Sequence, residues 1–277
     1  MSNNPLVSVY ITTKNRCDLL QRAIDSVIAQ TWKNIEILIC DDGSEDGTEE
    51  LVQRYIAQHD NISYFKNDYS RGACFSRNRA IAKAKGLYIT GLDDDDYFLP
   101  QRVEKLMSAF KPKYAFVCST YIRKTNTGSK HVKDGVGKLT LSDLLHYNRV
   151  GNQVLSLTER FKQVGGFDES LPAFQDYDMW VRMLKQFGTC VKILDPLYVF
   201  DISHANERIS ASPRVQEGYK LFLAKHKVLM NNSHLDSMEL LSTSINKNNL
   251  SIIDAIRLCN RGNYKSVINS FFKQTNV

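Results

Sequence analysis

Four aspartates in a row, Asp93 to Asp96, follow the apolar run LYITGL and precede the apolar stretch YFLP at 97–100. Adjacent carboxylates repel one another, so folding alone gives no reason to place four of them at the end of a buried strand. A divalent cation would offset that repulsion. Magnesium and manganese accept oxygen ligands, and magnesium is commonly held by one or two carboxylates together with substrate phosphates. The acidic run therefore predicts a phosphate-bridging metal and, with it, a nucleotide ligand.

The spacing inside the acidic run suggests separate roles for its members. In an extended chain, alternate side chains point to the same side, so Asp93 and Asp95 form a pair. One of them can bind the metal while the other meets a ribose hydroxyl or a metal-bound water. Asp96 stands directly before Tyr97 and is equally consistent with capping the helix that follows. A solvated acidic loop before Pro100 is the alternative for the whole run.

A second carboxylate, Asp42, ends another apolar run and opens the turn cluster DGSEDGT. A carboxylate accepts a hydrogen bond from the N–H of a uracil ring, so Asp42 suits the base or the ribose of a nucleotide; a simple turn acid is the alternative. The chain has no GxGxxG after its first apolar run and no GxxxxGK[ST] anywhere, which are the usual glycine-rich phosphate sites. A nucleotide held by carboxylates and metal fits a nucleotide-sugar better than ATP.

The elements that must position these acids alternate along the first hundred residues. Strands are expected at 6–12, 35–40, 62–67 and 87–92, and helices at 18–30, 49–59 and 71–86. This order predicts an α/β fold with right-handed crossovers and a mostly parallel sheet flanked by helices. Ligands of such sheets bind beyond the carboxyl ends of the strands, so the two acidic clusters can line one crevice.

The second half of the chain is less regular. We expect helices at 102–110, 141–147 and 177–187, strands at 114–122 and 190–202, and a mobile polar loop at 125–138. Trp180 is interpreted as a core residue in preference to a platform for an acceptor sugar. Beyond Pro213 the pattern predicts helical segments with polar breaks.

Charge and cysteine usage narrow the class of protein. The chain of 277 residues has a net charge of +6, and from Ala211 onward nine Lys or Arg stand against four Asp or Glu. This basic surplus is either a solvated face or a contact with anionic membrane lipid or a diphosphate-linked lipid acceptor. The six cysteines form no C-x-x-C pair and are interpreted as reduced thiols of a cytosolic protein. Neither a secretory signal nor a membrane-spanning apolar run is evident.

Several linked motifs resemble glycosyltransferase family 2 with the GT-A fold. They are VSVYITTKNR, IEILICDDGSEDGT, RGACFSRNRAIAKAKGLYITGLDDDD, GGFDESL and QDYDMWVRM, in this order over roughly residues 5–210. Any one of them would be a weak signal, but the ordered set is specific. The resemblance implies a GT-A (Rossmann-like) domain over 1–210, with a nucleotide-binding half at about 1–100 and an acceptor-binding half at about 101–210. Residues 211–277 would form a helical C-terminal extension.

The resemblance also implies roles for residues of the nucleotide-binding half. Asp42 looks like the base-binding acid, and Thr12 would lie beside the nucleotide. Asp93 and Asp95 look like the metal-binding DxD pair, with Asp95 the direct metal ligand. Asp94, between them, is expected to contact the nucleotide-sugar. Arg77 is either a contact of the diphosphate or part of a basic helix face.

Further roles fall in the acceptor-binding half. Asp176 looks like the general base. The family usually has Glu-Asp at that point and this chain has Gln175-Asp176, so Gln175 is expected to hydrogen-bond a sugar. Asp178 is the rival base, although an acid in the first helical turn also stabilises the helix N-terminus. His204 resembles the late histidine that can complete the metal shell.

Together these features predict an inverting, metal-dependent glycosyltransferase using Mn²⁺ or Mg²⁺. UDP-glucose or UDP-galactose is the expected donor, and a glycan or polyprenyl-diphosphate-linked glycan the expected acceptor. The context would be bacterial surface polysaccharide synthesis (O-antigen or capsule) in the cytoplasm or at the inner face of the plasma membrane, without a nucleic-acid partner. A sugar-nucleotide nucleotidyltransferase is one alternative, although TTKNRCDLL lacks the glycines of its usual loop. A non-catalytic nucleotide-sugar-binding protein is another, against which the retained acids argue.

Overall fold

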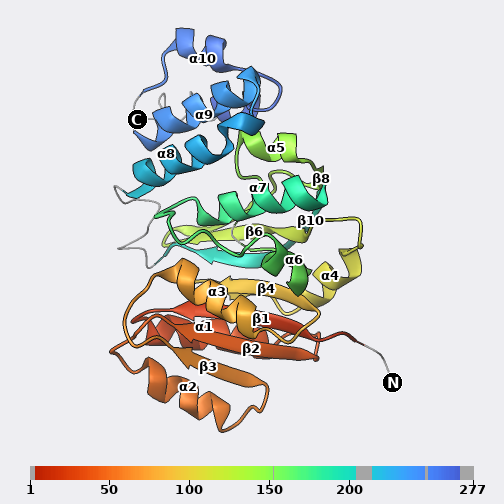
Figure 1. Ribbon diagram of the computed structural model, residues 1–277, viewed down its shortest axis with the longest axis vertical. Helices are drawn as coiled ribbons and strands as arrows, with labels where there is room; N and C mark the ends of the chain where they lie inside the picture. The colour runs from red at the N-terminus through yellow and green to blue at the C-terminus, as the bar shows by residue number, and fades with distance from the viewer. Residues whose placement is uncertain (1–3, 152, 204–213, 247–248, 269–277) are drawn as a thin grey trace.

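A ten-stranded sheet runs through the computed structural model, which describes residues 4–151, 153–203, 214–246 and 249–268 (Figure 1). The strand order is β3-β2-β1-β4-β9-β6-β10-β5, with β7 beside β6 and β8 beside β10. The nucleotide-binding half predicted from the sequence contains the strands at one end of this order. The later strands of the chain extend the sheet from β4 onward.

The first half has the predicted alternation of strands and helices. Its strands are β1 (Val7–Thr13), β2 (Ile35–Asp41), β3 (Ile62–Lys66) and β4 (Tyr88–Asp93), and its helices are α1 (Cys17–Ile28), α2 (Thr48–Ile56) and α3 (Ala73–Lys83). The three pairings among these strands are all parallel. Every residue of β1 is buried, as expected for a parallel strand whose two faces are both covered.

The register of the strands brings the predicted acidic clusters to one edge. Thr12 of β1 is aligned with Asp93 of β4 on one side, and Thr13 is aligned with Asp41 of β2 on the other. The carboxyl ends of β2, β1 and β4 therefore lie next to one another. This confirms that one edge of the sheet carries both the DDGS turn and the start of the acidic run, as the predicted parallel topology requires.

The second half adds antiparallel pairings to the sheet. Its strands are β5 (Tyr97–Phe98), β6 (Val117–Thr125), β7 (Gly128–Val132), β8 (Gly137–Leu139), β9 (Leu155–Leu157) and β10 (Cys190–Asp201), and its helices are α4 (Arg102–Ala109), α5 (Leu141–His146), α6 (Thr158–Gln163) and α7 (Gln175–Phe187). β10 runs parallel to β6, whereas β9 is antiparallel to both β4 and β6 and so joins the two halves. Trp180 is fully buried, which confirms it as a core residue.

The prediction of a mobile polar loop at 125–138 is wrong. This segment contains β7, which forms an antiparallel hairpin with β6, and it leads into β8, which pairs with β10. The polar composition has a different cause: the first residues of β7 are exposed to solvent, so the strand has no need of apolar side chains there. The hydrogen bonds of the hairpin are made by the backbone, which polar composition does not reveal.

Helices dominate the described C-terminal region, namely α8 (Arg214–His226), α9 (Asn232–Ile245) and α10 (Ile252–Leu258). They stack at the end of the molecule farthest from β3 and α2 (Figure 1). The Phe222 ring of α8 stacks on the Tyr177 ring of α7 at a centroid distance of 4.2 Å. Within the described ranges, no helix is both long enough and apolar enough to cross a membrane.

A buried charge cluster fixes α8 against α7. Asp178 is fully buried, and its carboxylate accepts hydrogen bonds from Arg182 (2.8 Å) and from the His226 ring (2.8 Å), with the Lys225 ammonium also 2.8 Å away. Burial raises the pKa of Asp178, but the hydrogen bond from His226 and the charge of Arg182 hold it below its ordinary value. The side chain of Asp178 is thus occupied in joining two helices rather than in stabilising the start of one.

Candidate active site

A buried guanidinium connects the acidic end of β4 to the first turn of α7. Asp93 Oδ1 accepts a hydrogen bond from Arg77 Nη2 at 2.9 Å, and the other terminal nitrogen of Arg77 lies 3.5 Å from Asp176 Oδ1. Arg77 comes from α3 and is 8% exposed. Its charge therefore stands between two carboxylates that are far apart in the sequence and come from different halves of the chain.

Asp176 has the properties of a proton acceptor at neutral pH. Burial raises its pKa to about 7; the Arg77 charge acts in the opposite direction, and the nearby Asp93 carboxylate raises it further. Asp176 Oδ1 has no hydrogen-bond donor among the described residues. A carboxylate with a pKa near the working pH is suited to general-base chemistry.

The chain enters α7 through an unusual backbone conformation that sets the direction of Asp176. Phe174, directly before the helix, has a positive φ of 67°, which is uncommon for a bulky residue. Its ring packs against the Phe222 ring of α8 at a centroid distance of 5.6 Å. The described C-terminal helices thereby support the position of the helix start that carries Asp176.

Arg16, just before α1, neutralises the middle of the acidic run. Its Nη1 lies 3.0 Å from Asp94 Oδ1 and 3.3 Å from Asp95 Oδ2. Asp94 is buried, which raises its pKa to about 6 although the Arg16 charge lowers it. The side chains of Asp93 and Asp95 keep 18% and 17% of their surface exposed, so a ligand can reach them.

The carboxylates of Asp93 and Asp95 fit a divalent cation in their chemistry, because magnesium and manganese prefer oxygen ligands. Over the described ranges, no group of three or more His, Cys, Asp or Glu side chains is arranged to hold a metal unaided. A cation at this edge would therefore take further ligands from the phosphates of a bound nucleotide. His204, the predicted extra ligand, lies outside the described residues.

Asp96 does not cap the following helix; the residue before α4 is Gln101. Asp96 is fully buried and accepts hydrogen bonds from the Tyr198 hydroxyl (2.7 Å) and the Asp201 backbone N–H (2.9 Å). Burial raises its pKa well above the ordinary range. Asp96 thus ties the turn after β4 to β10, and sequence spacing could not reveal a partner about a hundred residues away.

Asp42 fixes the start of the helix that carries Arg77. Its carboxylate accepts hydrogen bonds from the backbone N–H groups of Arg71 (2.7 Å) and Gly72 (2.9 Å), and from the hydroxyl of Ser70 (2.6 Å). Burial raises the pKa of Asp42, but these hydrogen bonds hold it below its ordinary value. In this structure Asp42 positions the loop before α3. Its role toward a nucleotide base, like that of Thr12, stays a prediction.

Sequence reasoning missed Gln153, which links the acidic edge to the second half of the sheet. Its side-chain N–H donates to Asp93 Oδ1 (3.1 Å), and its side-chain oxygen accepts from the Tyr10 hydroxyl (3.0 Å). Gly91 leaves room for this contact, because a Cβ there would lie 2.2 Å from Gln153 Oε1 and 2.3 Å from the Tyr10 ring. An uncharged residue in GNQVLSL gives no motif signal. The antiparallel pairing of β9 with β4 is what brings it to Asp93.

A mixed α/β sheet whose parallel first strands gather carboxylates at their ends is the architecture of GT-A glycosyltransferases, and comparison with known proteins agrees. The family model "Glycosyl transferase family 2" matches residues 8–166, and the chain belongs to this family. It is 39% identical over 235 residues to a protein of Escherichia coli (strain K12) named for colanic acid biosynthesis, the glycosyl transferase WcaA; the match covers 82% of this chain and 83% of that protein.

Other relatives are longer than this chain. It is 30% identical over 188 residues to the chondroitin synthase of Escherichia coli, a match that covers 65% of this chain and only 26% of that protein. Among solved structures, S. aureus TarS 1–349 in complex with UDP-GlcNAc superposes with a TM-score of 0.68 at 17% identity, covering 95% of this chain and 79% of that one. The mannosyltransferase PcManGT from Pyrobaculum calidifontis, in complex with GDP-Man and Mn²⁺, superposes at 0.66 and 13% identity over 100% of this chain and 76% of that one. At these identities the superpositions establish the fold.

The close approach at Gly91 gives a prediction about stability. Gly91→Ala should lower the free energy of unfolding by about 1–3 kcal/mol, because the added methyl group meets Gln153 and the Tyr10 ring in a packed interior. Urea denaturation measures the change. Gly47→Ala is the control, since a Cβ at that position would meet only the Cys17 sulfur at an ordinary 3.6 Å. Equal stability of the two variants would contradict this account of the contact.

Proposed function

We propose that this chain is an inverting, metal-dependent glycosyltransferase that moves a sugar from a UDP-sugar to a glycan or lipid-linked glycan during surface polysaccharide synthesis. Arg77 carries the proposal, because it contacts both Asp93 and Asp176 and so unites the strand-end acids with a proton acceptor. The names of the WcaA and chondroitin synthase relatives support polysaccharide synthesis. Glucose or galactose is the sugar to test first.

Different residues of the acidic edge would bind different parts of the donor. Asp93 and Asp95 would hold Mg²⁺ or Mn²⁺, with Asp94 and Arg16 beside them and His204 as a further candidate. A bound cation of this kind neutralises the diphosphate and makes it a better leaving group. Arg77 and Arg16 are the nearby cations of the protein itself, and both lie within 3.3 Å of strand-end carboxylates.

Asp176 would act on the acceptor. Its ionised carboxylate takes the proton of the acceptor hydroxyl while that oxygen attacks the anomeric carbon from the face opposite the diphosphate. The new carbon–oxygen bond forms as the bond to the diphosphate oxygen breaks, so one displacement inverts the configuration. Arg77 keeps Asp176 partly ionised despite its burial, since its charge lowers the pKa that burial raises.

A lipid-linked acceptor would bring the protein to a membrane, and α10 has the surface for such a contact. Ile252, Ile253 and Ile256 are 64%, 78% and 74% exposed on one side of this helix, whereas Ala255 and Leu258 are buried on the other. Exposed apolar patches of this kind commonly mark interaction sites. Arg261 and Lys265 are exposed in the following segment. We therefore propose an anionic lipid surface as the partner of α10, since both the apolar face and the basic surplus suit it.

The metal assignment predicts how UDP binds. Calorimetry should show tighter UDP binding with Mn²⁺ than without it, because the cation bridges the strand-end acids and the phosphates. Asp95→Ala should remove most of that gain. Asp60→Ala, which removes an exposed acid of the same type elsewhere on the surface, should preserve it. A UDP affinity that is independent of metal in the unmodified protein would refute the assignment.

The general-base assignment predicts a large loss of rate. Asp176→Asn keeps the shape of the side chain but cannot accept the proton, so donor consumption should fall by roughly 10²- to 10⁴-fold. The assay is UDP release from a panel of nucleotide-sugars with Mn²⁺, and UDP affinity should change little. Asp178→Asn, normalised to folded protein, should retain far more activity, because Asp178 is engaged with α8. The reverse order of the two variants would show that the wrong aspartate has been chosen.

The half-buried position of Asp176 also predicts the pH dependence of the activity. Only the ionised carboxylate accepts a proton, and its pKa is raised to about 7. The value of kcat/KM for donor consumption should therefore rise with pH, reach half of its plateau near pH 7 and level off above that pH. An activity that stays at its plateau down to about pH 5, near the ordinary range for carboxyl groups, would contradict a raised pKa at the base.

The lipid contact predicts binding to vesicles of defined composition. The protein should sediment with phosphatidylglycerol vesicles more than with phosphatidylcholine vesicles, and salt should weaken the binding. Replacing Ile252, Ile253 and Ile256 together by Ser should reduce binding by at least about 10-fold, since burial of one such side chain is worth roughly 1.5–3 kcal/mol. Val228→Ser, an exposed apolar residue outside α10, is the control. If the protein does not bind these vesicles at low salt, the proposed contact of α10 with lipid is wrong.

A further inference from the structure

Arg102, at the start of α4, is a buried cation without a carboxylate partner in the described part of the chain. It is 1% exposed. Its Nη1 donates to the Ser119 hydroxyl at 2.8 Å and its Nη2 to the Gln153 carbonyl oxygen at 3.3 Å, both of which are neutral groups. Its Nε has no acceptor among the described residues. Every other buried guanidinium discussed above has an acid beside it.

The surroundings of Arg102 stabilise the cation only in part. The guanidinium carbon lies 4.7 Å from the centroid of the Phe98 ring and 5.0 Å from that of the Tyr198 ring. Such cation–π contacts stabilise a buried cation, but by less than the cost of burying a charge that has no ionic partner. Burial accordingly lowers the pKa of Arg102 to about 10. An anion bound next to the guanidinium would supply the missing partner.

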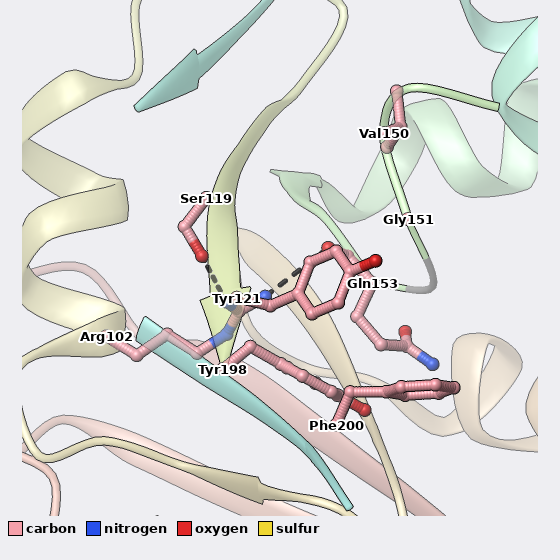
Figure 2. Close-up of a pocket in the computed structure, with 8 residues that line it drawn as sticks. All are labelled: Arg102, Ser119, Tyr121, Val150, Gly151, Gln153, Tyr198 and Phe200. Atoms are coloured by element: carbon pink, nitrogen blue, oxygen red, sulfur yellow. Dashed lines mark hydrogen bonds between the residues drawn. The ribbon is translucent and has the colours of Figure 1, made fainter. Parts of the chain in front are cut away.

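A cavity of about 60 Å³ adjoins this cation (Figure 2). Its lining residues are Arg102, Ser119, Tyr121, Val150, Gly151, Gln153, Tyr198 and Phe200. A cavity needs roughly 10–15 Å³ on this measure to hold one water, and one of about 150 Å³ holds a benzene ring, so this cavity is large enough for one small planar group but not for a sugar ring. Tyr121 and Phe200 are half-buried, and their rings meet edge to face at 6.0 Å. A ring held against these aromatic side chains could place one substituent in the cavity.

The cavity adjoins the candidate active site through Gln153. The side chain of this residue lines the cavity and donates to Asp93, while its backbone carbonyl accepts from Arg102. The other lining residues belong to β6, β10, α4 and the segment before β9, which lie in the half of the chain expected to bind the acceptor. The donor acids Asp42 and Asp94 are not among them.

We propose that this cavity binds the carboxylate of a uronate-type sugar unit in the acceptor glycan, with Arg102 as its counter-ion. The planar guanidinium matches a carboxylate in geometry, and Ser119 places a hydroxyl beside it. Tyr121 offers an apolar face to the sugar ring, and Gln153 sets the distance to Asp93. The inference rests on the proposed function and adds the substrate class: an acidic acceptor is favoured over a neutral one.

The test compares three methyl glycosides that differ only in the group at C6, which is charged in one of them and neutral in the other two. Binding of methyl β-D-glucuronide, its methyl ester and methyl β-D-glucoside is measured by NMR titration of the full chain in the presence of UDP and Mg²⁺, which is diamagnetic. The acid should bind at least about 10-fold more tightly than the ester and the glucoside, a difference of about 1.4 kcal/mol. Arg102→Gln should abolish this preference. Arg123→Gln, which removes an exposed cation of the same strand as Tyr121, should retain it.

Four results would overturn the proposal. They are equal binding of the acid and its ester, an unchanged preference in folded Arg102→Gln, equal competition by inorganic phosphate, and a preference for UDP-glucuronate over UDP-glucose in place of any acceptor preference. If Arg102→Gln does not fold, Tyr121→Ala tests the same site. This change removes a half-buried ring that lines the cavity and should weaken glucuronide binding. UDP affinity measured in the same samples keeps the two proposals apart: metal-dependent UDP binding without glucuronide binding would refute only this one.

Discussion

A buried guanidinium between two carboxylates organises this molecule. Arg77 can remain charged in the interior because Asp93 and Asp176 lie beside it, and each carboxylate in turn depends on that charge. The three residues come from α3, β4 and α7, so their contact fixes the acidic edge of the sheet against the helix of the other half. Removing Arg77 would leave two carboxylates facing each other without the cation between them, whereas removing one carboxylate leaves Arg77 the other as its partner. The arrangement that would perform the chemistry therefore also joins the two halves.

Much of the surrounding structure supports this cluster. Asp42 holds the loop that leads into α3 and so sets the position of Arg77. On the opposite side, α8 contacts α7 through the buried hydrogen bond between His226 and Asp178 and through the stacked ring of Phe222. The described part of the predicted C-terminal extension is thus packed against the helix that carries Asp176. We infer that truncating the chain near residue 210 would disturb the site as well as the extension.

The sequence was sufficient to predict the four strands of the first half, their parallel order and the edge at which the acids meet, together with β6 and β10. Those features follow from local patterns: apolar runs of strand length, helical periodicity, and acids placed directly after strands. The contacts of Asp96 and Asp178 could not be predicted, because their partners come from β10 and α8 and depend on tertiary packing. Arg16 ends the motif VSVYITTKNR, but its contacts with Asp94 and Asp95 depend on tertiary packing, and Gln153 was missed because an uncharged side chain gives no motif signal. The β7 hairpin was mistaken for a loop because an exposed ribbon has the same polar composition.

The central claim is that Arg77 controls the protonation of the half-buried Asp176, and carbon-13 NMR of the aspartate carboxyl groups tests it most directly. In the unmodified protein the Asp176 resonance should titrate with a midpoint near 7. In Arg77→Gln the midpoint should move higher, because the charge that favours the ionised form is gone while burial remains. A midpoint near the ordinary carboxyl value of about 3.9 in the unmodified protein, or one that Arg77→Gln leaves unchanged, would contradict the account.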